Sequence, residues 1–349
     1  MASPSFERFD YLLRTNKSIE RKLVFDFISS AQRKFSIPDY WYLGFGSMWF
    51  GDFRIAHRVL HIDDMISIEH PQYSARAEYN KPFSSITVIG GESTEVLKAG
   101  ISADLWSRPN VCWLDYDGQA DDLVVDDLKE VLKKSRLNSF ALATVNAARG
   151  TYRPKDNALV AGAPKTAIAV VSKILGASSI PKDYVHLLEA DHRTRDVPER
   201  DFPKFLAQCM LNFMQHHLTT LARSVFDDVT KEEKKISFFP AFQLHHRDGA
   251  DMVTVGGALI LEELRPQWIA VSSAHTAICE AGQSRYCVMD LVPLTLKEKI
   301  SLDRSLPSTL DNAAYLGRIR AEGIRLPDDE IEKYRTFYRQ FPMFVETTY

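Results

Sequence analysis

The sequence has 349 residues, 45% of them hydrophobic, and its 43 Lys and Arg against 46 Asp and Glu give a formal net charge of −3. These values are typical of a globular protein with one large domain or two smaller ones, and they exclude a disordered, fibrous or strongly charged chain. The nearly balanced charge provides no long-range field that would gather nucleic acid or an anionic membrane, so any basic groove must be local.

The sequence shows no sign of export or of membrane insertion. Its first ten residues, MASPSFERFD, lack the charged and then apolar pattern of a signal peptide. No run of about 18 apolar residues is present that could span a bilayer. We therefore expect a cytoplasmic protein without a membrane partner.

The four cysteines are scattered along the chain and have no metal-ligand spacing: Cys112, Cys209, Cys279 and Cys287. In a cytoplasmic protein of this size such cysteines are expected to be reduced thiols. A bridge between Cys279 and Cys287 is the minor alternative.

The first predicted element is an amphipathic helix. Apolar residues recur every fourth position over Ser18–Phe35, and Ser18 is the candidate N-cap. Three charged residues, Lys17, Glu20 and Arg21, lie in its first turn. They either cover a ligand or form a solvated charged turn, and the sequence favours neither.

The segment after this helix alternates short apolar strands with helices. The predicted strands are Tyr40–Gly44, Met65–Glu69, Ile86–Ile89, Val111–Asp115 and Ser139–Val145. The predicted helices are roughly Phe50–Leu60, Pro71–Tyr79, Thr94–Ala99 and Asp122–Lys134. Such an alternation predicts βαβ units and a parallel sheet covered on both faces.

The second half of the chain has a different pattern. Helices are predicted over Gly162–Leu175 and, with a long amphipathic pattern, over Asp201–Phe226, separated by the polar and irregular segment Ile180–Arg200. The segments Ile236–His245 and Met252–Leu261 then predict a β-hairpin.

Further turn and tail signals follow in the same half. The hairpin turn contains Asp248-Gly249, and Gly256-Gly257 is interpreted as a turn or strand end. The segment Leu294–Leu306 is ambiguous, and Asp328–Phe341 predicts a closing helix.

Five βα units followed by an antiparallel hairpin is the element order of class I S-adenosylmethionine (SAM) methyltransferases; an NAD-binding Rossmann domain would continue with a sixth parallel strand. The predicted fold class is therefore α/β, a Rossmann-like sheet with a terminal hairpin. We expect residues 1–262 to form this domain, with a helical insertion at about 176–235. Residues 263–349 are expected to be a C-terminal extension that packs on it.

A glycine-containing loop follows the first predicted strand. In Leu43-Gly44-Phe45-Gly46-Ser47 the small residues let the backbone approach a ligand and turn into the next helix. Glu69 ends the next strand, where an acidic residue in this fold accepts the two hydroxyl groups of a ribose. The alternatives are a tight strand–helix turn and a solvated strand end.

Polar residues also follow the third and fourth predicted strands. Gly90-Gly91-Glu92-Ser93 is placed to lie beside an adenine, with Glu92 accepting from its amino group and Ser93 as an alternative helix N-cap. The fourth strand ends with Asp115-Tyr116-Asp117-Gly118, at the edge where open α/β sheets place ligands. Asp115 and Asp117 are the candidate catalytic carboxylates, and a simple turn is the alternative.

The runs NKSIER, YLGFGSMWFGDF, MISIEH, VIGGESTEVL and WLDYDG resemble a bacterial family described as putative O-methyltransferases, within the class I SAM-dependent methyltransferases. The resemblance covers Asn16 to about Leu261 and weakly includes the C-terminal tail. It implies that SAM is the cofactor and that the loop Gly44, Phe45, Gly46 and Ser47 surrounds its methionine part.

The same resemblance assigns roles to further residues. Glu69 would bind the ribose and Glu92 the adenine edge, Asp115 would face the sulfonium and the acceptor, and Tyr116 would pack against either of them. The sequence departs from the family pattern at one point, because Tyr42-Leu43 stands where an acidic residue usually precedes the first glycine. The methionine amine is thereby left without its common anchor.

A magnesium-dependent variant is a minor alternative. Some catechol-type O-methyltransferases bind Mg²⁺ through an Asp after the fourth strand and an Asp-Asn pair after the fifth. Asp115 and Asn146 match two of these positions, but Val145 stands where the second carboxylate belongs. We therefore expect no metal site.

The histidines are interpreted as structural or exposed. His57 and His61 are four residues apart on a helix, but a third ligand is missing. The adjacent pairs His216-His217 and His245-His246 point apart on a helix and on a strand, respectively.

Three functions are compatible with this sequence. The first is a SAM-dependent methyltransferase that methylates an oxygen of a small-molecule or polar acceptor, with Asp115 orienting or deprotonating it. The second is a methyltransferase for RNA or DNA, for which Arg193, Arg195 and Arg200 form the only modest basic cluster. The third is a non-catalytic sensor or interaction protein that keeps the fold.

Overall fold

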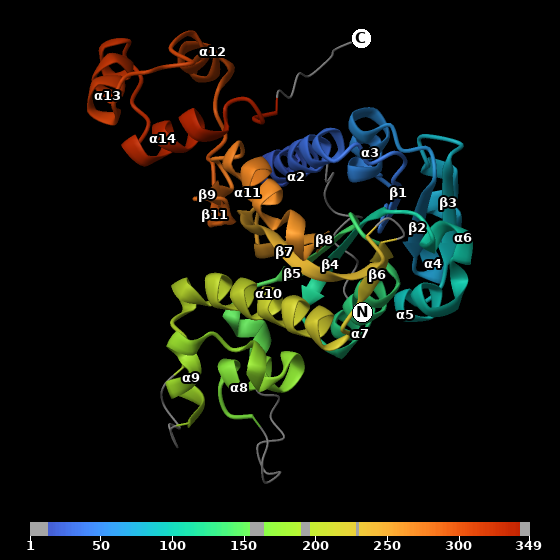
Figure 1. Cartoon of the computed structure of the whole chain (residues 1–349). Helices are drawn as coiled ribbons and strands as arrows, with labels where there is room; N and C mark the ends of the chain where they lie inside the picture. Colours follow the sequence, from blue (N-terminus) through green and yellow to red (C-terminus); the bar gives the residue numbers. More distant parts are fainter. Residues whose placement is uncertain (1–12, 154–163, 190–195, 228–229, 343–349) are drawn as a thin grey trace.

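The computed structural model describes residues 13–153, 164–189, 196–227 and 230–342, which form an α/β fold around one large sheet (Figure 1). The strands of this sheet are β1 (Trp41–Gly44), β2 (Met65–Glu69), β3 (Ile86–Gly90), β4 (Asn110–Gln119), β5 (Phe140–Asn146), β6 (Ser224–Asp227), β7 (Glu232–Arg247), β8 (Asp251–Leu261) and β11 (Tyr286–Met289). Two short strands, β9 (Cys279–Glu280) and β10 (Gln283–Ser284), pair separately.

The helices lie between these strands and after them. They are α2 (Thr15–Lys34), α3 (Gly51–Leu60), α4 (Pro71–Asn80), α5 (Ser93–Glu95), α6 (Ala103–Trp106), α7 (Asp122–Lys134), α8 (Ala167–Leu175), α9 (Lys182–Glu189), α10 (Phe202–Thr220), α11 (Arg265–Ser273), α12 (Leu296–Arg304), α13 (Asn312–Ala321) and α14 (Asp328–Phe337). A π-helical turn at Val96–Gly100 continues α5.

The strand order is β11-β7-β8-β5-β4-β1-β2-β3, with β6 paired to β7. Strands β1 to β5 are parallel to one another, β8 is antiparallel to β5, and β7 is antiparallel to β8. The hairpin therefore inserts its second strand beside β5. This topology confirms the predicted Rossmann-like sheet with a terminal antiparallel hairpin.

The predicted strand and helix positions of the first half are confirmed with small shifts at their ends. The predicted N-cap of the first helix is wrong, because α2 begins at Thr15 with Arg14 at its N-cap position. Strand β4 continues to Gln119, so Asp115 to Gly118 belong to an irregular strand end and not to a simple turn.

The second half differs more from the prediction. The segment 180–200, predicted to be irregular, contains α9, and the long predicted helix ends at Thr220 because Ser224–Asp227 pairs with β7 as an edge strand. The ambiguous segment 294–306 contains α12, which a reciprocal cap between Thr295 and Glu298 begins. The helix predicted over Gly162–Leu175 is α8, and its predicted first residue, Gly162, lies outside the described residues.

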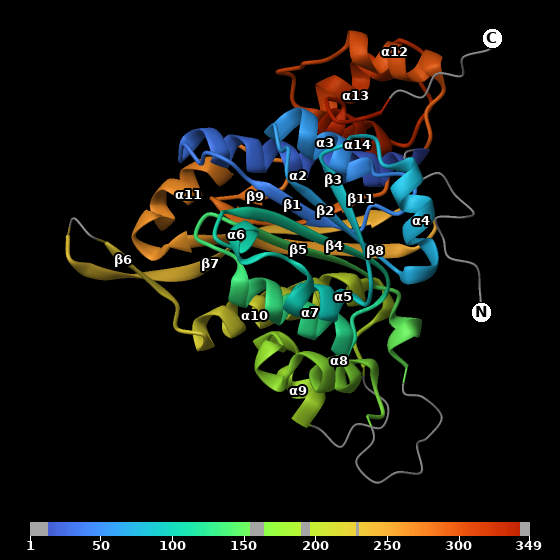
Figure 2. The ribbon, with the colours of Figure 1, turned by 90° about the vertical axis from the view of Figure 1, so that its right-hand side faces the viewer.

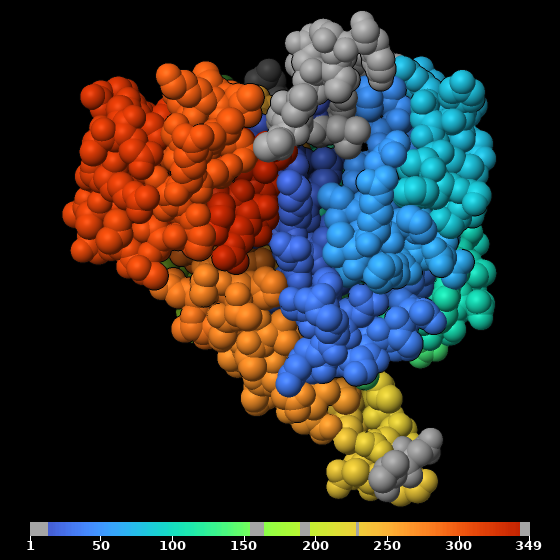
Figure 3. Space-filling view, turned by 90° about the horizontal axis from the view of Figure 1, so that it is seen from above, coloured from blue at the N-terminus to red at the C-terminus, as the bar shows by residue number. Residues whose placement is uncertain are grey.

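The sheet separates two apolar cores. Figure 2 shows it nearly edge-on, with α2, α3 and α11 on one face and α7, α8 and α10 on the other. In the space-filling view from above, α2 and α3 (blue) lie between the C-terminal extension (orange to red) and the α4 region (cyan) (Figure 3). The helices thereby cover both faces and leave the carboxyl ends of the parallel strands at an edge.

The C-terminal residues after 262 are part of this architecture. They add β11 to the main sheet, parallel to β7, and then form α12 to α14. Apolar residues of α13 and α14, including Tyr315 and Ile331, belong to the same core as α2. The division into a domain of residues 1–262 and an extension of residues 263–349 remains our proposal.

The structure also bears on the state of the cysteines and on the search for a membrane-spanning helix. All four cysteines are free thiols and buried, so the minor alternative of a Cys279–Cys287 bridge is wrong. Among the helices of the described residues, none is long and apolar enough to span a membrane.

Gly256 and Gly257 are not at a turn or a strand end, as expected, but inside β8. A methyl group at Gly257 would collide with the carbonyl oxygen of Phe239 on β7, and one at Gly256 would collide with the backbone of β5. These glycines therefore allow the hairpin to pack closely on the parallel part of the sheet.

We predict that Gly257→Ala destabilises the protein by about 3 kcal/mol, because the added methyl group must displace the backbone of β7. Urea unfolding measures the difference. Gly317→Ala in α13 is the matched control: its methyl group meets no atom within 4 Å, so stability should rise by about 0.5–1 kcal/mol. Equal stability of wild type and Gly257→Ala would contradict this packing.

Candidate active site

The loop after β1 is held close to the end of β2. The backbone N–H of Gly46 donates to Ser67 Oγ at 2.9 Å, and that of Ser47 donates to Glu69 Oε1 at 2.8 Å. A methyl group on Gly46 would overlap the ring of Phe50 and Ser67 Oγ, so this position requires glycine. Glycine at this position therefore lets the loop pack closely on Phe50 and on the end of β2.

Glu69 is the residue on which this loop depends. Its Oε1 also accepts the Ser67 hydroxyl at 2.6 Å, so both described hydrogen bonds of its side chain go to one oxygen. Burial raises the pKa of Glu69, and the bonds from Ser67 and Ser47 partly oppose that rise. The carboxylate thus anchors the loop through one oxygen and can accept hydroxyl groups with the other.

The ends of β3 and β4 are tied together through Asp127 of α7. This fully buried carboxylate accepts the hydroxyls of Ser93, of Thr94 at 2.5 Å and of Tyr116 at 2.6 Å. Ser93 therefore bonds Asp127 and is not the N-cap of α5, a position that Glu92 occupies. Sequence reasoning missed Asp127, although a carboxylate on the apolar face of a helix between Val124 and Val131 is a recognisable signal.

These loops enclose a cavity of about 380 Å³ at the carboxyl edge of β1 to β4. All but one of the predicted site residues line it: Phe45, Gly46, Ser47, Glu69, Gly91, Glu92, Ser93, Asp115, Tyr116 and Asp117. The exception is Gly44, which lies behind the loop against the Trp113 carbonyl and Tyr42. The structure thus brings residues from four strand ends together, as the sequence predicted.

The charged first turn of α2 is buried beside this cavity. Lys17 Nζ lies 2.9 Å from Glu20 Oε2, and 2.9 and 3.0 Å from the two oxygens of Asp115. It also lies 4.9 Å from the centre of the Trp113 ring. Lys17 and Arg21 are 4% and 5% exposed and Glu20 is not exposed, so the alternative of a solvated turn is wrong.

Burial by itself lowers the pKa of Lys17, but Asp115 and Glu20 outweigh this effect and raise it. Lys17 is therefore a fixed ammonium group. It holds the carboxylate of Asp115, at the end of β4, against the first turn of α2.

His246 of β7 completes this buried cluster. Its Nδ1 lies 3.2 Å from Glu20 Oε1, and the imidazole is almost completely buried. Burial would raise the pKa of Glu20, but the charges of His246 and Lys17 outweigh it and hold the pKa below its usual range. Because an ionised carboxylate can only accept, Nδ1 of His246 donates to Glu20, and Nε2 is the ring nitrogen that Glu20 does not use.

A second cavity, of about 420 Å³, adjoins the first. Three residues line both: Arg21, Asp115 and Asp117. The other lining residues come from α2, the end of β5 and the β7–β8 hairpin: Arg14, Lys17, Asn146, His246, Asp248, Gly249, Ala250 and Met252. Two spaces of the size of small-molecule sites thus meet at the carboxyl end of β4.

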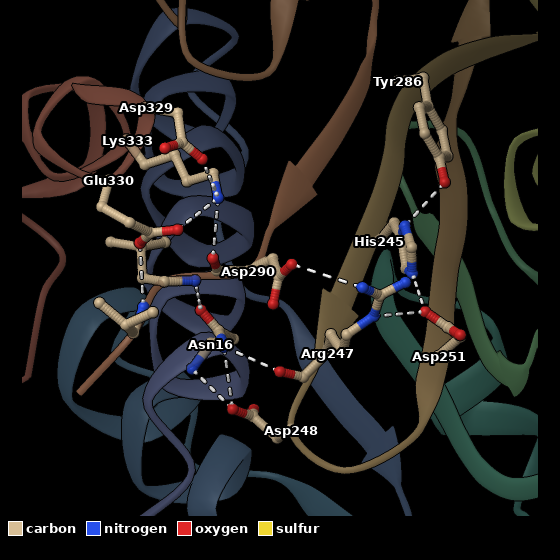
Figure 4. Close-up of polar contacts among 12 residues, drawn as sticks. Asn16, His245, Arg247, Asp248, Asp251, Tyr286, Asp290, Asp329, Glu330 and Lys333 are labelled. Carbon is tan, nitrogen blue, oxygen red and sulfur yellow. Dashed lines mark hydrogen bonds and ion pairs between the residues drawn. The ribbon is translucent and has the colours of Figure 1, made fainter. Parts of the chain in front are cut away.

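A polar network fixes the elements around the second cavity (Figure 4). The side chain of Asn16, 2% exposed, donates to Asp248 Oδ1 at 3.1 Å and to the Arg247 carbonyl at 2.9 Å, and accepts the Leu291 N–H at 2.9 Å. The N–H of Lys17 donates to Asp248 Oδ2 at 2.8 Å. The hairpin turn, helix α2 and the C-terminal extension are therefore joined at the residue preceding Lys17.

Two other histidines singled out from the sequence, His245 and His57, have hydrogen-bond partners within the protein. His245 bonds Asp251 and Tyr286, each at 2.8 Å (Figure 4). His57 bonds the Ile62 carbonyl. Among the described residues, no group of three or more His, Cys, Asp or Glu is arranged to hold a metal ion. At the position of the magnesium alternative, Asp115 binds the Lys17 ammonium with both oxygens.

A scan of protein families matches residues 9–349 to the family described as "Putative O-methyltransferase". The chain therefore belongs to this family, and the expected family is confirmed. No protein with a curated function has a sequence similar enough to match.

Solved structures give more distant similarities. An O-methyltransferase family protein from Burkholderia thailandensis is 8% identical, with a TM-score of 0.31 over 68% of this chain and 56% of that one. The N-methyltransferase NodS from Bradyrhizobium japonicum WM9 is 8% identical, with a TM-score of 0.33 over 69% of this chain and 97% of NodS.

LepI, solved with SAH (the demethylated product of SAM) and a substrate analogue, is 7% identical, with a TM-score of 0.31 over 64% of this chain and 43% of LepI. The chain spans less than two thirds of the length of several of these structures, including LepI and the Burkholderia protein. Scores at this level carry no conclusion about activity.

We predict that Glu20→Gln lowers the stability at pH 7 by about 2 kcal/mol, because charged hydrogen bonds to His246 and Lys17 are lost. The lowered pKa of Glu20 stabilises the folded state above the ordinary pKa of 4.5. Below that pH the unfolded chain takes up the proton before the folded protein does. The difference in unfolding free energy between the wild type and Glu20→Gln should therefore shrink by about 1.4 kcal/mol per pH unit.

Urea unfolding between pH 7 and pH 3 measures this difference. Glu78→Gln, at an exposed ion pair with Lys81 on α4, is the control and should change stability by less than about 1 kcal/mol throughout. A difference between wild type and Glu20→Gln that stays constant over this range would contradict the buried ion pairs.

Proposed function

We propose that this protein transfers the methyl group of SAM to an oxygen of a small, polar acceptor. The observation that carries the proposal is the meeting of two cavities at Asp115 and Asp117, one of which is lined by the glycine loop and Glu69. The first cavity would hold SAM and the second the acceptor. We further propose that the protein acts in the cytoplasm.

The residues of the first cavity suit the parts of SAM. Phe45, Gly46 and Ser47 line this cavity, so the ligand would lie against the loop after β1. Glu69, with one oxygen used by the loop, would accept the ribose hydroxyls. Glu92 at the start of α5 would accept from the adenine amino group, with Gly91 and Ser93 beside the base, and Tyr116 would pack against the ligand.

Asp115 and Lys17 would act together at the boundary of the two cavities. Because Lys17 binds both oxygens of Asp115, this carboxylate is better suited to orient an acceptor than to remove its proton. The exposed Asp117, which lines the same two cavities as Asp115, would also contact the acceptor. Bound SAM would supply an electrophilic methyl group, whose bond to sulfur breaks as the bond to the acceptor oxygen forms.

The proton of the acceptor hydroxyl needs a base, and His246 is the residue that we propose for this role. It lines the second cavity, and its Nδ1 donates to Glu20, so Nε2 of the deprotonated ring would be the nitrogen that accepts the proton. In this arrangement Glu20 orients the ring and stabilises the imidazolium that forms, while the proton moves from the acceptor oxygen to Nε2.

We predict that Glu69→Ala weakens SAM binding more than tenfold, or by roughly 1.4 kcal/mol, because the ribose loses its acceptor. Isothermal titration calorimetry measures the affinity. Ser67→Ala is the matched comparison, since it removes the hydrogen bonds of Ser67 to Gly46 and Glu69 but keeps the carboxylate. Its loss of SAM affinity should be smaller than that of Glu69→Ala. Unchanged affinity in Glu69→Ala would remove the ribose assignment, and no binding by the wild type would remove the proposed function.

We predict that His246→Phe lowers methyl transfer by about 100-fold or more while SAM affinity changes by less than about twofold, since His246 lines the second cavity and not the first. Formation of SAH is followed with labelled SAM and the low-molecular-weight fraction of a bacterial extract. His245→Gln is the control, because His245 lines neither cavity, and it should retain the rate. Full activity of His246→Phe would exclude it as the base.

The same assay, repeated with total RNA in place of the small molecules, tests the nucleic-acid alternative. Arg193 and Arg195 of the expected basic cluster lie outside the described residues, and Arg200 is exposed. We expect no turnover with RNA, because Asp115, Asp117 and Asp248 line the acceptor cavity together with its cations. Turnover with RNA alone would favour the second function.

A further inference from the structure

A buried carboxylate without an assigned role lies in the wall of the first cavity. Asp52 is the second residue of α3 and is 5% exposed, and it lines this cavity together with Gly51 and Arg21. Arg21 also lines the second cavity. Its charge interacts with those of Arg21 and Asp115, which line both cavities, and with that of Glu69 at the end of β2.

Tyr42 of β1 positions this carboxylate. The tyrosine is fully buried, and its ring packs edge-on against that of Phe53, with the ring centres 4.8 Å apart. Its hydroxyl donates to Asp52 Oδ2 at 2.5 Å. Tyr42 stands two residues before Gly44, where the family pattern has an acidic side chain. A hydroxyl at the end of β1 thus reaches across to a carboxylate of the next helix.

The charges around Asp52 leave this carboxylate without full compensation. Burial raises its pKa; Arg21 and the Tyr42 hydroxyl oppose this effect, and Asp115 adds to it. The N-terminal turn of α3 favours a negative charge, but a helix terminus offers only a partial one. A cation bound in the cavity would provide the missing compensation.

We infer that Asp52, positioned by Tyr42, binds the α-ammonium group of the amino-acid part of SAM, with the Arg21 guanidinium on the same wall suited to its α-carboxylate. The inference rests on the proposed function and deepens it, because it assigns a recognition site to the one part of the ligand for which the sequence offered no anchor. The acidic group is supplied by α3, and β1 supplies the tyrosine that orients it.

The test compares two ligands that differ in this group. SAH carries the amino-acid part, whereas 5′-methylthioadenosine keeps the adenosine and the sulfur but lacks the ammonium and the carboxylate. Calorimetry measures both affinities in the wild type and in Asp52→Asn. We expect the variant to lose at least about tenfold in SAH affinity and to bind 5′-methylthioadenosine within about twofold of the wild type.

Two further variants make the result decisive. Tyr42→Phe keeps the ring and removes the hydroxyl, so it should reduce SAH affinity severalfold and again spare 5′-methylthioadenosine. Asp126→Asn, at an exposed ion pair with Lys129 on α7, is the matched control and should change neither affinity. The Tyr42 variant also covers the case in which Asp52→Asn fails to fold.

Equal losses for the two ligands in Asp52→Asn, or no loss for SAH, would overturn the assignment and leave the proposed function intact. Failure of the wild type to bind either ligand would instead overturn the proposed function, and the inference with it.

Discussion

The buried ammonium group of Lys17 is the interaction on which the rest of the site depends. It joins Glu20 of the same helix to Asp115 at the end of the central strand β4. Charges are costly to bury unless they are paired, so the positions of α2 and of this strand end are fixed relative to each other. Both cavities are bounded by residues of this contact, and neither would keep its shape if α2 moved away from the sheet.

The cluster also gives its carboxylates different tasks. Glu20 is enclosed by Lys17 and His246, and Asp115 shares the same ammonium group while it borders both cavities. Asp52 is held by a tyrosine and has a raised pKa. One carboxylate is thus compensated within the protein, one shares its ammonium group, and in the third the effect of burial outweighs that of its neighbours. Perturbed pKa values of this kind cluster at functional sites, and networks of structural ion pairs produce them as well.

The sequence predicted the parts of this architecture that local pattern determines. Apolar runs of strand length and the Gly44–Ser47 loop located the sheet and one wall of the first cavity, because parallel strands end at a common edge. It could not predict that Lys17 and Glu20 are buried, since their partners Asp115 and His246 are far away along the chain. Nor could it predict β11, a short strand that depends on pairing with β7. The role of Tyr42 was hidden because the carboxylate it positions, Asp52, lies on the following helix.

The C-terminal extension belongs to the same argument. Asn16 accepts the N–H of Leu291 and donates to the hairpin turn, directly before Lys17 in the chain. Lys333 of α14 donates to the Asp290 carbonyl and pairs with Glu330, which fixes the segment that holds Asn16 (Figure 4). Because Asn16 and Lys17 are consecutive in α2, the contacts of the extension also set the position of the ammonium group. The extension is therefore tied through Leu291 to the residue that precedes Lys17, and the family match includes it.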